Sequence, residues 1–225
     1  MAVVKQKPNG KGSLKDIQQL INHHKDLLNH EISRELPKLN EIKWVSPCQE
    51  DDYAEYSDSD FLSKINVKPI YPLEKFWPKR GPQWDALGIA RNSPILVEAK
   101  ANIPELVSPG SQAGEASMSL IRPSLEMVKT NLNIINDRDW TDTFYQYTNR
   151  IAHLYYLREL NKVPAFLVNV YFINDDTVNG PKTKEEWQGA IYLLKSYLGL
   201  GRHKLSKYMI DVFIDVKDMQ TGLKK

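Results

Sequence analysis

Apolar residues recur at helical spacing near the start of the chain. They fall mostly three or four positions apart between Ser13 and Pro37, at Leu14, Ile17, Leu20, Ile21, Leu27, Leu28 and Ile32. The pattern predicts one helix over 14–36, capped by Ser13 and ended by Pro37. Residues 1–13 are rich in Lys, Gly and polar side chains and are expected to be disordered. We interpret 14–49 as an N-terminal helical extension that includes a short strand, IKWVS.

The rest of the chain alternates between strand and helix patterns. An acidic-headed helix is predicted over 51–65, and four prolines then keep the chain extended up to Pro82. The later elements are a hairpin (83–90 and 94–101), a loop (104–119), helices (119–135 and 139–161), a strand (165–173), a helix (185–200) and a strand (209–216). This order predicts an α/β (α+β) domain over 50–225, with a mixed central sheet flanked by helices.

Two charged residues stand in the otherwise apolar second strand of the hairpin. Side chains alternate along a strand, so Leu96, Glu98 and Lys100 share one face, opposite to that of Ile95, Val97, Ala99 and Ala101. A turn with Asn92 and Ser93 as its loop residues sets Asp85 opposite Lys100, with Cβ atoms about 5 Å apart. The sequence therefore predicts that Asp85, Glu98 and Lys100 converge.

Buried charges require pairing or a bound ion. The simplest alternative is a structural salt bridge between Asp85 and Lys100, with Glu98 reaching solvent. The other reading is chemical: two carboxylates can hold Mg²⁺ or Mn²⁺, and an ammonium beside them can orient a water molecule or stabilise developing charge. Such a set suits the hydrolysis of phosphodiester bonds.

The hairpin WDALGI…PILVEAKANIPEL resembles the core of the PD-(D/E)XK nuclease superfamily. With EYSDSDFL before it and YQYTNRIAHLYYLREL after it, the likeness to a bacterial branch of that superfamily covers about residues 50–215. The resemblance implies a restriction-endonuclease-like fold and metal-dependent DNA cleavage. Asp85 and Glu98 would be metal ligands, the carbonyl of Ala99 a further ligand, and Lys100 the catalytic lysine. Trp84 stands where the family name has Pro.

The same resemblance suggests further site residues outside the hairpin. Glu55 is the best match for a metal-binding glutamate from a preceding helix, with Glu50 as the second choice, although Glu55 is equally compatible with an exposed acidic helix. Gln146 matches a catalytic glutamine on the helix after the Glu-x-Lys strand. The stripe of Gln146, Asn149, Arg150 and His153 follows helical spacing. It either contacts phosphates and water or forms the solvated side of the helix.

Composition adds limits on location and partners. The formal net charge of +2 does not by itself indicate nucleic acid, so DNA as partner rests on the resemblance. No apolar run approaches about 18 residues, so no membrane is expected and we expect a cytoplasmic protein. The sequence leaves a homo-oligomer open. The leading hypothesis is a Mg²⁺- or Mn²⁺-dependent nuclease, and the alternative is a non-catalytic nucleic-acid-binding or regulatory module that retains the fold.

Overall fold

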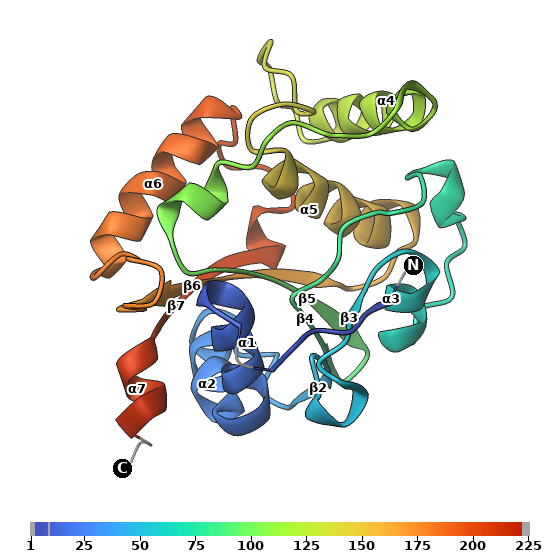
Figure 1. Cartoon of the computed structure of the whole chain (residues 1–225). Coiled ribbons are helices and arrows are strands. Elements are labelled where there is room, and N and C mark those ends of the chain that lie inside the picture. The colour runs from blue at the N-terminus through green and yellow to red at the C-terminus, as the bar shows by residue number, and fades with distance from the viewer. Residues whose placement is uncertain (1–2, 9, 222–225) are drawn as a thin grey trace.

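Five strands form a mixed central sheet in the order β2-β4-β5-β6-β7 (Figure 1). The computed structural model describes residues 3–8 and 10–221. The strands are β2 (Ile42–Ser46), β4 (Ala86–Ala90), β5 (Ser93–Lys100), β6 (Phe166–Ile173) and β7 (Met209–Asp215). β4 runs antiparallel to both of its neighbours, β2 and β5, whereas β5, β6 and β7 run parallel to one another. The predicted mixed sheet flanked by helices is confirmed.

Helices cover both faces of this sheet (Figure 1). One face carries α1 (Gly12–His23) and α2 (Lys25–Glu35), and the other carries α4 (Glu115–Asn131), α5 (Tyr145–Tyr155) and α6 (Lys184–Tyr197). A π-helical turn, η4 (Tyr156–Leu160), extends α5. Outside these layers lie β1 (Val3–Val4), β3 (Glu55–Tyr56), α3 (Asp58–Lys64), α7 (Val216–Thr221), and the 3₁₀ turns η1 (Gln49–Asp51), η2 (Leu73–Lys75), η3 (Ile103–Leu106) and η5 (Ser206–Tyr208). Among the described residues, no helix has the length and apolar character needed to cross a membrane.

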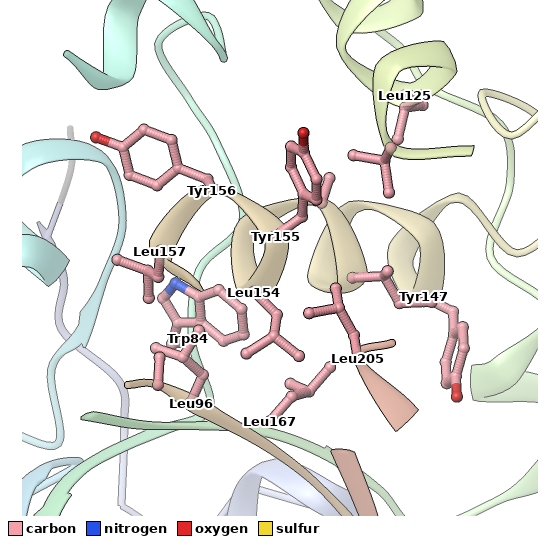
Figure 2. Packing of buried hydrophobic residues seen from close by; sticks show 14 of the residues in the cluster. Trp84, Leu96, Leu125, Tyr147, Leu154, Tyr155, Tyr156, Leu157, Leu167 and Leu205 are labelled. Atoms are coloured by element: carbon pink, nitrogen blue, oxygen red, sulfur yellow. The ribbon is translucent and has the colours of Figure 1, made fainter. Parts of the chain in front are cut away.

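The alternation of side chains along β5 divides the core into two layers. Leu96 packs with Trp84, Leu167 and the underside of α5, where Figure 2 shows Leu154 close to them. The opposite set, Ile95, Val97, Ala99 and Ala101, packs against residues of α1 and α2. This division confirms the predicted two faces of the strand. It also means that β5 is buried on both sides, so a charge on it needs a partner.

The N-terminal part of the chain differs from the prediction. The expected single helix is two helices, because His24 leaves helical geometry (φ −133°, ψ 25°), and α1 begins at Gly12, so Ser13 lies inside it. The expectation of disorder over 1–13 is wrong for 3–8 and 10–13, since Val3–Val4 pair with β3; residues 1–2 and 9 lie outside the described residues. The predicted boundary between the N-terminal extension (14–49) and the following domain (50–225) does not separate two hydrophobic cores, because β2 of the extension is a strand of the central sheet.

Several other boundaries also move. The helix expected over 51–65 is divided into η1, β3 and α3, since Asp52 and Tyr53 have positive φ angles of 57° and 52°. The helix expected over 119–135 spans Glu115–Asn131. The helix expected over 139–161 begins only at Tyr145, after Phe144 in the left-handed region. The strands predicted over 165–173 and 209–216 are present with nearly the predicted ends.

Candidate active site

The β4–β5 hairpin brings the three predicted residues together by a register that differs from the predicted one. Ala90 pairs with Ser93 and Ala86 with Val97, so continuing the ladder sets Asp85 opposite Glu98 instead of Lys100. The side-chain period of a strand is two, so a shift of two positions keeps Asp85 on the same face. Its convergence with Glu98 and Lys100 therefore survives the error in register.

These residues line one pocket of about 400 Å³. Its walls contain every residue of the predicted site: Glu55, Asp85, Glu98, Ala99, Lys100 and Gln146, together with Asn149 and Arg150. Glu50, the second choice for the additional glutamate, lies elsewhere, in an open depression of about 1130 Å³ along β2. Glu55 comes from the short strand β3 and not from the predicted helix. It is buried, which contradicts the exposed-helix reading.

Glu98 is held between two cations. Its Oε1 lies 2.7 Å from Lys100 Nζ, and its Oε2 accepts a hydrogen bond of 2.5 Å from Arg150 Nε. Burial alone would raise the pKa of Glu98, but Arg150 and Lys100 outweigh it and lower this pKa. The alternative of an Asp85–Lys100 bridge with Glu98 in solvent is therefore wrong, because Glu98 is the ion-pair partner and is only 6% exposed.

Arg150 is the partner that sequence reasoning did not assign. Its guanidinium donates to Glu98, to the carbonyl of Gln83 (2.8 Å) and to Asn149 Oδ1 (2.9 Å), and it lies 4.8 Å from the centre of the Trp84 ring. The helical stripe correctly grouped Arg150 with Gln146, but spacing could not tell that most of the stripe points inward. The only sequence signal for the pairing was an arginine on a helix predicted beside the sheet.

The solvated-side reading of that stripe is wrong for three of its four residues. Asn149, Arg150 and His153 are buried, and only Gln146 is exposed. His153 lies among aromatic rings outside the pocket, where its Nδ1 contacts the carbonyl of Asn149 at 2.8 Å. Burial lowers the pKa of His153 to about 3, so this ring stays neutral and makes no phosphate contact from its present position.

Asp85 and Glu55 lack the cationic partners that Glu98 has. Asp85 Oδ2 accepts from the backbone N–H of Ala99 at 2.7 Å, and Glu55 Oε2 accepts from Gln6 Nε2 at 3.0 Å. Across residues 3–8 and 10–221, neither carboxylate forms an ion pair. Burial, followed by the negative charge of Glu98, raises the pKa of Asp85 to about 8. Burial also raises the pKa of Glu55.

Lys100 stands between the acids and the helix. Burial lowers its pKa, but Glu98 and Asp85 outweigh that effect and raise it, so the side chain is an ammonium. Its Nζ also donates to Gln146 Oε1 at 3.0 Å. The backbone N–H of Gln146 in turn donates to Ser108 Oγ at 2.9 Å, which anchors the start of α5 to the loop that borders the pocket.

The donor chemistry of the pocket fits a divalent cation. Three carboxyl groups share the pocket with two cationic side chains, and both cations are bound to Glu98, so Asp85 and Glu55 are the two carboxyls without a cationic partner. As the side chains stand, no three acidic, His or Cys groups of the described residues form a ready metal cage. Cation binding by Glu98 would thus require it to exchange one contact with Lys100 or Arg150.

Comparisons of the chain with protein-family models, curated proteins and solved structures found no match.

Proposed function

We propose that this protein is a Mg²⁺- or Mn²⁺-dependent nuclease that hydrolyses phosphodiester bonds in DNA on a restriction-endonuclease-like fold. The observation that carries the proposal is the convergence of Asp85, Glu98 and Lys100 in one polar pocket at the end of a hairpin. The antiparallel β4–β5 hairpin followed by parallel β6 supports the resemblance of the hairpin sequence to the PD-(D/E)XK core.

The predicted site residues each have a role in this proposal. Asp85, Glu98, the carbonyl of Ala99 and Glu55 would hold the ion. When bound, such an ion lowers the pKa of its water, which supplies a nucleophile at neutral pH. Lys100 brings a positive charge beside the scissile phosphate, where it orients the attacking water or offsets developing negative charge. Gln146 keeps that ammonium in place through its side-chain oxygen.

Ion binding can be tested by stability. A cation that binds only the folded chain stabilises it by about 2.7 kcal/mol at a hundredfold excess over the dissociation constant. The melting temperature of the wild type should therefore rise with Mn²⁺ over its value in EDTA. Asp85→Asn should abolish that rise, because it removes a carboxyl that has no cationic partner and is free to bind the ion. A wild-type melting temperature that does not change with Mn²⁺ would overturn the metal site.

Cleavage can be tested separately on duplex, single-stranded and branched DNA. Lys100→Met should abolish Mn²⁺-dependent cleavage while the circular dichroism spectrum is retained. Lys195→Met is the matched control, since Lys195 also pairs with an acid, Asp211 at 2.6 Å, but lies outside this pocket. If the Lys100 variant and the control cleave DNA equally, Lys100 has no catalytic role. Wild-type protein that cleaves none of these substrates would overturn the proposed activity.

One observation favours the alternative function. Lys100 and Arg150 already neutralise Glu98, so this carboxylate has partners without any metal. A non-catalytic module that binds or regulates nucleic acid would keep this arrangement unchanged. It would bind DNA with an affinity that falls steeply with salt and shows no dependence on divalent ions, and it would leave the DNA uncut.

A further inference from the structure

An N-terminal segment is attached directly to the strand that carries Glu55. This segment, residues 3–8, is called the strap. Within it, Val4 pairs with Glu55 in the β1–β3 ladder, and the backbone N–H of Gln6 donates to the carbonyl of Asp52 at 3.1 Å. An exposed ion pair between Lys5 and Asp52, 2.6 Å long, adds a further contact. The strap therefore lies along β3, as the course of the chain near its N-terminus shows (Figure 1).

The strap also reaches the carboxylate itself. Gln6 Nε2 donates to Glu55 Oε2 at 3.0 Å, and this is the only side-chain hydrogen bond of Glu55 found within residues 3–8 and 10–221. Glu55 is only 6% exposed, so losing its donor would leave a buried carboxylate without a hydrogen-bond partner. On its other side, β3 contacts the segment that leads into β4, because Trp84 N–H donates to the carbonyl of Tyr56 at 3.2 Å.

The chemical type of this partner distinguishes Glu55 from Glu98. Glu98 is bound by two cations, Lys100 and Arg150, whereas Glu55 is bound by a neutral amide. An amide donor fixes the direction of a carboxylate and occupies one lone pair, and it leaves the negative charge uncompensated. A carboxylate held in this way remains able to bind a cation in the pocket that it shares with Asp85.

We propose that Gln6 is a positioning residue of the site and that the strap is the element that aims Glu55 into the pocket for cation binding. This inference rests on the metal dependence of the proposed function. Residues that hydrogen-bond a metal ligand typically change metal affinity ten- to a hundredfold when they are removed. The N-terminal segment, which the sequence pattern assigned to disorder, is then part of the candidate active site.

Calorimetric titration of the full chain with Mn²⁺ tests this role. Gln6→Met removes the donor and keeps the length of the side chain. It should raise the dissociation constant for Mn²⁺ by about tenfold. Lys5→Ala is the control on the same strap, and it should leave the constant unchanged because the pair with Asp52 is exposed. A third variant is Glu55→Gln. Adding Gln6→Met to this variant should not change its dissociation constant for Mn²⁺ any further, since Gln6 acts through Glu55.

The possible outcomes separate this inference from the proposed function. If the wild type does not bind Mn²⁺, the metal-dependent function fails, and this inference fails with it. If the wild type binds Mn²⁺ and Gln6→Met binds equally well, only the positioning role is overturned. It is also overturned if Gln6→Met weakens binding further in the Glu55→Gln background, because the effect would then pass through the fold in general. Thermal melts in EDTA verify that each variant is folded.

Discussion

Two buried carboxyls face each other where α1 meets the loop after β6. Asp16 and Asp175 are each 1% exposed, and the Oδ2 atom of each has no hydrogen-bond donor among the described groups. Asp175 Oδ1 accepts from the N–H and the hydroxyl of Thr177, at 2.8 and 2.7 Å. The two side chains can thus bond to each other only by sharing a proton. Burial is the main cause that raises the pKa of Asp16 to about 7, and the negative charge of Asp175 is the second. Lys15 lowers this pKa and Glu105 raises it, both by smaller amounts.

The size and the sign of the effect on stability follow from this pKa. The difference between the ordinary value of 3.8 and about 7 corresponds to on the order of 4 kcal/mol of unfolding free energy. The folded state holds the proton more tightly than the unfolded chain. The contribution is therefore fully present below pH 3.8, is lost as the pH rises toward 7, and stays absent above it. A loss of this size is a large part of the stability of an ordinary domain.

Asp16→Asn should remove this pH dependence. Asparagine has the same shape, carries no charge, and can donate through its side-chain nitrogen to Asp175 Oδ2. We expect the variant to gain a few kcal/mol over the wild type at pH 8 and to lie within about 1 kcal/mol of it at pH 4. Urea unfolding between pH 4 and pH 9 measures both proteins. The control is Asp137→Asn, which removes one charge from an exposed loop residue.

The refuting result is specific. If the free-energy difference between Asp16→Asn and the wild type is the same at pH 4 and pH 8, the carboxyl pair does not share a proton. A variant that is less stable than the wild type at pH 8 would contradict the reasoning as well, because the ionised pair would then be favourable. The Asp137→Asn control leaves the carboxyl pair intact and should not show the gain at pH 8 that is expected of Asp16→Asn.

Three further substitutions test the site and the sheet in metal-free protein. Glu98→Gln should lower the unfolding free energy by about 3 kcal/mol, because buried Arg150 loses its charged partner; an unchanged urea midpoint would contradict that pairing. At pH 9, Asp85→Asn should be at least as stable as the wild type, since the pKa of Asp85 is raised to about 8 and its charge is unfavourable there; a clear loss in thermal melts would refute this. Gly88→Ala should lower the unfolding free energy by about 1–3 kcal/mol, because its Cβ would lie 2.9 Å from Ile42 Cγ2. Equal stability of the variant and the wild type in urea would show that β2 shifts to make room for the methyl group.

The local pattern of the sequence was sufficient for the five strands of the central sheet and for the face on which the charges lie, although it missed the short strands β1 and β3. The alternation of apolar and charged residues over 94–101 predicted that Glu98 and Lys100 share a face with Leu96, and the two core layers agree with it. The predicted hairpin register was wrong by two positions, yet Asp85 still reached the same face. Side-chain direction along a strand has a period of two, so that error was harmless where a shift of one would have been decisive.

Tertiary structure alone decided which groups contact the acids of the pocket. Helical spacing placed Arg150 and Gln146 on one stripe, but only the packing of α5 onto the sheet turned Arg150 toward Glu98, 52 positions away in the chain. The contact between Gln6 and Glu55 likewise joins residues 49 positions apart. Periodicity reports which residues of one element share a face. The direction of that face, and the partners it meets, depend on contacts between distant segments, and the burial of apolar surface that assembles those segments is a property of the whole fold.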